Sequence, residues 1–169
     1  MNSIDDFYSQ LYNLSYITRY STVPRVKDES VAEHSFYVAS IVVKLYDEYV
    51  FDVGTAVTMA VIHDWTESWV DDVTVATKKK FPLIAEAVRL AEKETVLNEF
   101  TPYSSDLWLR LSYGTSVEAM IVHYADVLQC IQYAKHEVKL GNNGYMLKVL
   151  DMSTERAKLL EEKLNEFKR

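Results

Sequence analysis

The apolar positions along the chain recur at intervals of three or four residues almost throughout. This spacing places one apolar stripe on a helix. Between residues 4 and 18 the stripe consists of Ile4, Phe7, Leu11, Leu14 and Ile17. A polar connection, STVPRVKDES, follows, in which Pro24 discourages a helix. The pattern therefore predicts a first helix over residues 4–18 and a break before residue 30.

Two pairs of residues have the spacing of a capping box, in which a Ser or Thr side chain and a Glu three residues later satisfy the free N–H groups of a helix start. Ser30 with Glu33 predicts a second helix that continues to about residue 50. Thr115 with Glu118 predicts a long helix, which Gly141 should end.

The remaining pattern predicts four further helices. They are a helix capped by Asp52 that runs into His63 and Asp64, one over residues 82–100, a short one that begins at Ser104 or Ser105, and one over residues 145–168. No segment alternates as a strand would, although the β-branched residues of VDDVTVATK favour an irregular extended segment. The predicted fold class is all-α: a bundle of six or seven helices.

Composition adds bounds to this picture. The 169 residues are 49% hydrophobic, and the four Gly and three Pro form no linker, so we expect one domain over residues 1–169. The net charge of −7 argues against binding of a nucleic-acid polymer. No run approaches 18 apolar residues and the first twenty residues do not resemble a signal peptide, so we expect no membrane span. The single Cys130 is expected to be a buried thiol in a reducing, cytoplasmic setting rather than a catalytic group.

Four residues on three predicted helices are not explained by packing. His34 interrupts an apolar stripe, His63 and Asp64 end a helix, and Asp126 lies deep in the long helix, where a charge is costly unless it is paired or bound to a metal. Imidazole and carboxylate groups suit a divalent ion, and four protein ligands leave positions for water and substrate. Each residue also has an ordinary alternative, a hydrogen-bonded core histidine or an ion pair, so the pattern alone leaves a metal site about as probable as not.

At this point the sequence resembles a known family. The run R-Y…V-P-R-V-K-D-E-S-V-A-E-H-S-F, then H-D-W-T-E-S-W-V-D-D and later Y-A-D, is similar to the HD-domain phosphohydrolases, and among them to the 5'-deoxynucleotidases of the YfbR kind and to short phage enzymes that remove triphosphate from dATP. The resemblance extends from about residue 19 to residue 143. It implies an HD-type bundle and a cytoplasmic enzyme of a bacterium or a phage.

The resemblance also implies roles for individual residues. It makes His34, His63, Asp64 and Asp126 the ligands of one divalent metal ion, which is Co, Mn, Zn, Fe or Mg. It makes Glu67 the acid that acts with the water at the metal and Asp72 a substrate-contacting acid, both catalytic. It places Arg19 and Lys78 on the phosphate.

Two departures from the family affect substrate binding. Tyr20 stands where the bacterial enzymes carry a Trp near the sugar, so it is a substrate-binding candidate whose selectivity for a deoxy sugar is open. The segment VTVATKKK lacks an expected proline, and Lys79 and Lys80 either reach further phosphates or face water. His123, one turn before Asp126, is a candidate to contact either the phosphate or a metal ligand, but not to be a ligand itself.

The other aromatic and imidazole side chains near these motifs are not expected to take part in the active site. His136 reads as a surface residue. Trp65 and Trp69 are expected to pack the helix end against the core rather than to touch the base.

The predicted activity is metal-dependent hydrolysis of the 5'-phosphate ester of a 2'-deoxynucleotide, which releases phosphate from a dNMP or triphosphate from a dNTP. One alternative is an HD hydrolase of a signalling nucleotide, although such enzymes often need more His ligands than this chain has left. The other is a nucleotide-binding HD module without catalysis, which would have no need for Glu67. The resemblance further suggests a homo-oligomer whose only other partner is the small-molecule substrate.

Overall fold

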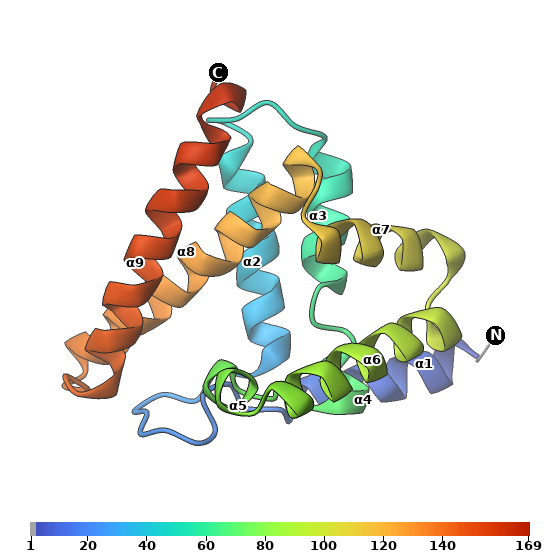
Figure 1. Ribbon diagram of the computed structural model, residues 1–169, viewed down its shortest axis with the longest axis horizontal. Helices are drawn as coiled ribbons and strands as arrows, with labels where there is room; N and C mark the ends of the chain where they lie inside the picture. The colour runs from blue at the N-terminus through green and yellow to red at the C-terminus, as the bar shows by residue number, and fades with distance from the viewer. Residues whose placement is uncertain (1–2) are drawn as a thin grey trace.

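The computed structural model describes residues 3–169 and shows an all-helical protein, as the apolar periodicity predicts. In these residues no β-strand forms, and the only bridges join Thr18 to Ser30 and Tyr49 to Lys168. The helices, labelled in Figure 1, are α1 (Ile4–Tyr12), α2 (Val31–Leu45), α3 (Val53–Ile62), α4 (Glu67–Val70), α5 (Val75–Lys80), α6 (Pro82–Glu99), α7 (Pro102–Tyr113), α8 (Val117–Lys139) and α9 (Tyr145–Leu164), with 3-10 turns at Asn13–Ser15 and Asn165–Phe167.

The seven predicted helices correspond to α1–α3 and α6–α9, and the short α4 and α5 are additional. The prediction of an extended segment in VDDVTVATK is wrong from Val75 onward. The Thr74 side chain accepts a hydrogen bond from the backbone N–H of Thr77 and so begins α5 there. A helix of six residues carries too little periodicity to be distinguished from a strand of β-branched residues.

Several predicted helix ends are also corrected. The first helix stops at Tyr12 and continues only as a 3-10 turn, and the second stops at Leu45 rather than near residue 50. The helix predicted to begin at Ser104 or Ser105 is α7, which begins at Pro102 after the cap residue Thr101. Proline suits the first turn of a helix because its missing N–H costs nothing there.

The capping box predicted at Thr115 and Glu118 is wrong. Ser116 caps α8 instead, by accepting a hydrogen bond from the Ala119 N–H. The Glu118 side chain accepts from the Asp52 N–H across the molecule, at 3.3 Å. The box at Ser30 and Glu33 and the Asp52 cap are confirmed.

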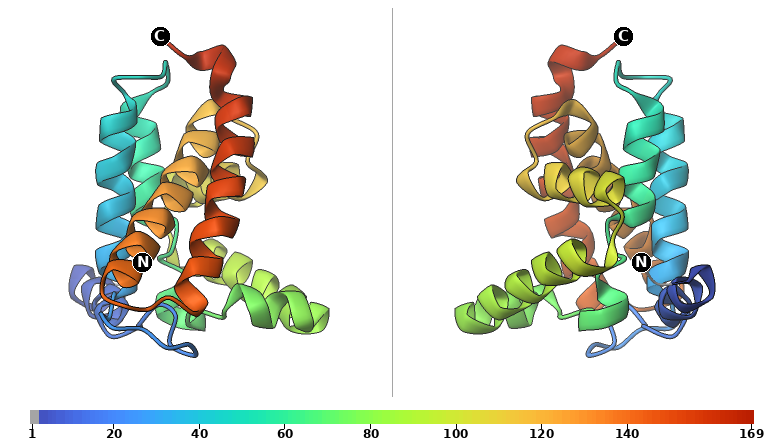
Figure 2. Two further views of the ribbon diagram at one scale, coloured as in Figure 1. Left: turned by 90° about the vertical axis from the view of Figure 1, so that its left-hand side faces the viewer. Right: turned by 90° about the vertical axis from the view of Figure 1, so that its right-hand side faces the viewer.

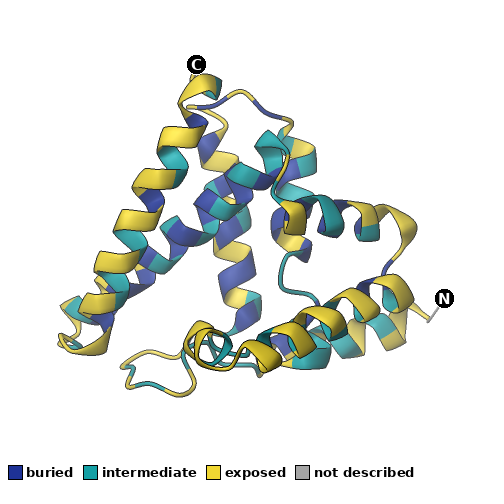
Figure 3. Ribbon diagram, viewed as in Figure 1, coloured by how far each residue is buried: buried dark blue, intermediate teal, exposed yellow. Residues whose placement is uncertain are grey.

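The core lies between α2, α3 and α8, with α7 and α9 packed around it (Figures 1 and 2). Figure 3 shows the buried faces of α2, α3 and α8 turned toward one another, whereas α6 is exposed along most of its length. Figure 2 shows α6 projecting away from this bundle. The molecule therefore has a packed part and a more exposed arm.

Trp65 and Trp69 pack at the border between these two parts. The Trp65 ring meets Phe7 of α1 and Phe100 after α6, with ring centroids 5.2 and 5.5 Å apart. Trp69 lies against the same Phe100 and the core. The predicted packing role of both tryptophans is confirmed. None of the helices in residues 3–169 combines the length and the apolar character that a bilayer span requires.

Candidate metal centre and active site

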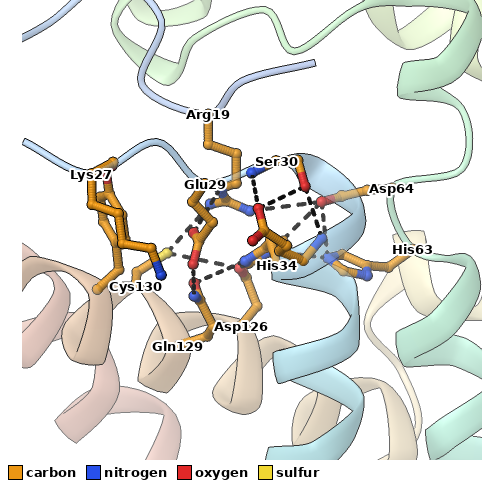
Figure 4. A network of polar contacts seen from close by, with 12 residues as sticks. Arg19, Lys27, Glu29, Ser30, His34, His63, Asp64, Asp126, Gln129 and Cys130 are labelled. Atoms are coloured by element: carbon orange, nitrogen blue, oxygen red, sulfur yellow. Dashed lines mark hydrogen bonds and ion pairs between the residues drawn. The ribbon is translucent and has the colours of Figure 1, made fainter. Parts of the chain in front are cut away.

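Three helices bring His34, His63, Asp64 and Asp126 together. His34 comes from the first turn of α2, His63 and Asp64 directly follow α3, and Asp126 lies in the middle of α8. The His34 Nε2 atom lies 3.3 Å from His63 Nε2, 3.6 Å from the Asp64 Oδ2 atom and 3.3 Å from the Asp126 Oδ1 atom (Figure 4). Ligand atoms of His34, His63 and Asp64 all lie within 4.8 Å of one another. Asp126 lies outside this three-residue group and joins it through its contact with His34. Two imidazole nitrogens and a carboxylate so close together, with a second carboxylate beside them, fit a divalent cation.

The hydrogen bond on the far side of the His63 ring fixes its tautomer. The His63 Nδ1 atom lies 2.6 Å from the backbone carbonyl oxygen of Ala60, which can only accept a hydrogen bond. Nδ1 therefore carries the proton, and Nε2 turns its lone pair toward the cluster. Such an outward donor is the usual companion of a histidine that binds a metal.

The carboxylates of the cluster stay ionised. Burial alone would raise the pKa of Asp64, but His63, His34 and Arg19 hold it below its usual range. Burial likewise opposes ionisation of Asp126, and His34 and Arg19 again keep its pKa low. The negative ligands are thus ready to bind a cation without first losing a proton.

Glu67 lies one turn after Asp64, at the start of α4. Burial raises the pKa of Glu67 to about 9, and the neighbouring Asp64 and Asp72 add to the rise. Burial also raises the pKa of Asp72, with Asp64 and Asp71 contributing. A carboxyl group with so high a pKa can hold or move a proton near neutral pH, as an acid–base group must.

Two cations adjoin the carboxylates. The Arg19 Nη1 atom lies 3.8 Å from Asp64 Oδ2, and the Arg19 side chain is largely buried. The Lys78 Nζ atom, on α5, lies 3.7 Å from the Glu92 Oε1 atom of α6 and is more open to solvent. Lys79 and Lys80 are exposed. The structure thus brings Arg19 to the metal ligands, and it places Lys78 in the electrostatic surroundings of Glu67 and Asp72.

A cavity of about 220 Å³ opens beside the cluster. It is lined by His63, Asp64, Trp108, Leu111, Ser112, Val122, His123 and Asp126. Since His123 Nε2 donates a hydrogen bond to the Leu111 carbonyl at 3.1 Å, this histidine faces the cavity without joining the ligand cluster. His136 is exposed, as predicted.

Tyr20 does not line this cavity. Its ring stacks on Tyr133 of α8, with ring centroids 5.2 Å apart, and its backbone adopts a φ of 56°, which is rare for a residue with a side chain. The Arg19 guanidinium lies 5.8 Å from the centre of the Tyr20 ring. Tyr20 therefore sits beside Arg19, on the loop between the first helix and α2.

Burial raises the pKa of the Cys130 thiol to about 11, so the thiol stays protonated. Cys130 is partly buried rather than buried, which corrects that part of the expectation. The protonated thiol is the less reactive form, which supports the expected absence of catalysis by Cys130.

Three polar residues behind the site, Gln129, Glu29 and Glu137, were not predicted from the sequence. The Gln129 Oε1 atom accepts a hydrogen bond from His34 Nδ1, and the Gln129 Nε2 atom donates one to Glu29. Glu137 accepts hydrogen bonds from the Val26 and Lys27 N–H groups at 2.7 and 2.8 Å. One signal was present in the sequence. Gln129 and Glu137 lie three and eleven residues after Asp126, on the inward side of α8, where apolar residues are expected.

Comparison with known proteins agrees with this geometry. The family model described as 5'-deoxynucleotidase YfbR-like matches residues 6–168. No curated protein sequence matches the chain significantly.

Solved structures provide the second comparison. A protein from Pyrococcus horikoshii superposes with a TM-score of 0.79 at 25% identity, covering 96% of this chain and 97% of its own. A conserved hypothetical protein from Pyrococcus furiosus gives 0.71 at 26% identity, over 94% and 97% of the two chains. An HD-domain phosphohydrolase from Listeria innocua gives 0.75 at 19% identity, over 94% and 82%, and at that identity the likeness is one of fold.

Proposed function

We propose, from the premise that the chain belongs to the YfbR-like 5'-deoxynucleotidase family, that it is a metal-dependent phosphohydrolase that cleaves the 5'-phosphate ester of 2'-deoxynucleotides. The products are a deoxynucleoside and either phosphate, from a dNMP, or triphosphate, from a dNTP. The observation that carries the proposal is the cluster of His34, His63 and Asp64, with Asp126 3.3 Å from His34 and with Glu67 in charge interaction with Asp64.

A divalent cation held by these four residues would lower the pKa of the attacking water and withdraw charge from the phosphoryl oxygens. The chain itself supplies positive charge from Arg19, at the cluster, and from Lys78, on α5, to bind the phosphate. Glu67 exchanges a proton with the water or with the leaving 5'-oxygen, for which its raised pKa suits it. Asp72, whose negative charge interacts with Glu67, orients the substrate.

Glu67 also separates hydrolysis from nucleotide binding without catalysis. A binding module needs the cations and the metal ligands but no proton-transfer group. The partly buried carboxyl of Glu67, held among Asp64 and Asp72 at an electrostatic cost, favours an enzyme.

The decisive experiment is a substrate panel. The purified protein is incubated with dNMPs, dNTPs and the matching ribonucleotides in the presence of Mn²⁺, Co²⁺ or Mg²⁺, and chromatography separates phosphate from triphosphate. We expect deoxynucleotide hydrolysis with at least one metal, and none with the Glu67→Ala protein prepared in parallel. Absence of hydrolysis for every nucleotide and metal would remove the proposal.

The panel also resolves the finer parts of the proposal. Release of triphosphate, as by the phage enzymes of the resemblance, is supported by the exposed Lys79 and Lys80, which follow Lys78 and can extend the positive surface toward further phosphates. In that case Lys79→Ala/Lys80→Ala should weaken dNTP hydrolysis more than dNMP hydrolysis. The comparison of metals identifies the preferred ion.

We further propose a cytoplasmic homo-oligomer. Three tyrosines, Tyr8, Tyr12 and Tyr16, are 62%, 49% and 73% exposed. The Tyr12 ring contacts the rings of both Tyr8 and Tyr16, and together they form an exposed aromatic surface suited to contact with a second copy. Light scattering coupled to size exclusion measures the mass, and a monomer at all concentrations would contradict this part.

A further inference from the structure

A chain of polar side chains runs from His34 away from the metal cluster to Arg19 (Figure 4). The His34 Nδ1 atom lies 2.8 Å from the Gln129 Oε1 atom, and the Gln129 Nε2 atom donates to Glu29 Oε1 at 2.7 Å. The second Glu29 oxygen, Oε2, lies 4.0 Å from Arg19 Nε. Gln129 and Glu29 are 4% and 6% exposed, and His34 is fully buried. We call these four residues the His34–Arg19 relay.

The hydrogen bonds of the relay have one direction. A carboxylate accepts hydrogen bonds but cannot donate them, so Glu29 requires the amide NH₂ of Gln129 to face it. The Gln129 carbonyl oxygen then faces His34 and needs a donor, which is the Nδ1–H of the imidazole. The proton of neutral His34 therefore sits on Nδ1, and the Nε2 lone pair points into the cluster, where His63, Asp64 and Asp126 lie.

The ion pair at the far end supports this direction. The Glu29 Oε2 atom lies 4.0 Å from the Arg19 Nε atom. A guanidinium beside a carboxyl group favours its ionised form, which can only accept hydrogen bonds.

Packing does not explain these side chains. Position 129 lies on the buried side of α8, between Val127 and Ile131, where an apolar residue would be more stable than an amide. A buried Glu beside it is costlier still. Both side chains instead contact residues of the candidate active site, Gln129 by its hydrogen bond with His34 and Glu29 by its ion pair with Arg19.

Glu29 interacts with both the backbone and the side chain of Arg19. The Arg19 backbone N–H donates to the Glu29 carbonyl at 2.9 Å, which closes the loop between them. Arg19 Nε and Glu29 Oε2 are both buried without a hydrogen-bond partner of their own, so they are left to interact with each other across 4.0 Å. Glu29 therefore bears on the place that the guanidinium occupies beside Asp64.

We propose that Gln129 and Glu29 are positioning residues that couple the metal ligand His34 to Arg19. Gln129 holds His34 in the tautomer that offers Nε2 to the metal, and Glu29 orients both the Gln129 amide and the Arg19 guanidinium. The assignment of phosphate to Arg19 rests on the proposed function. The effect on His34 and on metal affinity does not.

Metal titration without substrate tests the first half. Gln129→Met keeps the length of the side chain but removes the acceptor for His34. Its matched control is Gln132→Met, one turn further along α8 at an exposed position. Isothermal titration with Mn²⁺ should show affinity lower by about 10- to 100-fold for Gln129→Met, the loss that follows removal of a partner behind a metal ligand, and no change for the control. Equal affinities would overturn the role of Gln129.

Exchanging the two side chains tests the direction of the relay. In Glu29→Gln/Gln129→Glu the carboxylate accepts from both His34 Nδ1–H and the new amide at position 29, whose carbonyl oxygen faces Arg19. The net charge is unchanged. Each single variant should lose Mn²⁺ affinity. In Gln129→Glu the carboxylates at positions 29 and 129 repel each other. In Glu29→Gln the side chain at position 29 no longer determines which way the Gln129 amide is oriented. The double variant should recover most of the loss. Losses that simply add would refute the relay.

Nitrogen-15 NMR of the metal-free wild-type protein reads the tautomer directly and needs no variant to fold. We expect the His34 proton on Nδ1, and a mixture of tautomers in Gln129→Met. A wild-type proton on Nε2 would overturn the proposal. Since none of these measurements uses a nucleotide, a failed substrate panel with intact metal coupling would reject the proposed function alone, and an active wild type without coupling would reject the relay alone.

Discussion

The two sides of the candidate active site are built differently. The proposed metal ligands lie on α2, directly after α3 and on α8, whose faces form the core, and His34 is fully buried. Glu67 and Lys78 instead lie in the segment Glu67–Lys80, which consists of the short helices α4 and α5 and contains no buried side chain within those helices. The proposed ligand cluster is thus part of the folding core, whereas Glu67 and Lys78 lie on a segment without a fully buried side chain, which the core holds less tightly. Substitutions on the two sides should therefore fail in different ways.

Removal of a metal ligand should have the largest effect. His34→Ala deletes the imidazole that contacts all three other ligands, so metal binding and hydrolysis should both be lost. The expected fall in kcat/KM is about 10³-fold or more, since the cation supplies both the nucleophile and the charge stabilisation. Elemental analysis after dialysis and the hydrolysis assay measure the two losses. The matched control is His136→Ala, at an exposed position, and a similar loss there would show that the assay reports general damage.

Replacement of Glu67 should separate chemistry from metal binding. In Glu67→Gln the side chain keeps its shape but cannot transfer a proton, so we expect kcat to fall by roughly 10²- to 10⁴-fold. Because Glu67 lies outside the ligand cluster, bound metal measured on the same preparation should stay at the wild-type level. An unchanged kcat would end the acid–base assignment, and lost metal would make Glu67 a ligand.

The same contrast explains what the sequence could predict. Long helices repeat their apolar stripe several times, so α1–α3 and α6–α9 were found, and a histidine inside such a stripe, as at His34, stood out. The helix α5 covers fewer than two turns, and tertiary contacts rather than periodicity decide its form. Gln129 and Glu29 were missed because their roles depend on partners 95 to 100 residues away in sequence. The sequence pattern singled out the four candidate ligands, but the side chains that support them could not be identified from it.

A third region, the loop between Arg19 and Glu29, carries the proposed substrate residues Arg19 and Tyr20, and hydrogen bonds join it to α8. The fully buried Glu137 accepts hydrogen bonds from the Val26 and Lys27 N–H groups and from Asn142 at 2.7, 2.8 and 2.9 Å. Glu137→Gln turns an NH₂ toward one of these donors. The free energy of unfolding at pH 7 should fall by about 1–3 kcal/mol, measured by urea denaturation against the exposed control Glu155→Gln.

The pH dependence identifies the source of that stability. Burial alone would raise the pKa of Glu137, but the hydrogen bonds from Asn142, Val26 and Lys27 hold it below its ordinary value of 4.5. A lowered folded-state pKa stabilises the fold above the unfolded pKa, and this contribution is lost as the pH falls through the folded value. The difference between wild type and Glu137→Gln should therefore be full at pH 7 and shrink below pH 4.5. A difference that stays constant on acidification would mean that the carboxylate charge is not what anchors the loop.

Replacement of Lys78 should have the smallest effect. It tests whether the Lys78 side chain contacts the substrate. Lys78→Ala removes one charge-assisted contact to the phosphate, so KM should rise about tenfold with a smaller change in kcat. The thermal midpoint should barely move, because the Lys78–Glu92 pair is separated by 3.7 Å and partly exposed to solvent. Lys93→Ala, an exposed lysine of α6, is the control that accounts for the lost net charge alone. If both variants raised KM equally, Lys78 would act only through the long-range field of the protein. If Lys78→Ala instead lowered the midpoint by several degrees, the segment Glu67–Lys80 would be part of the folding core, and the contrast with the metal ligands would not hold.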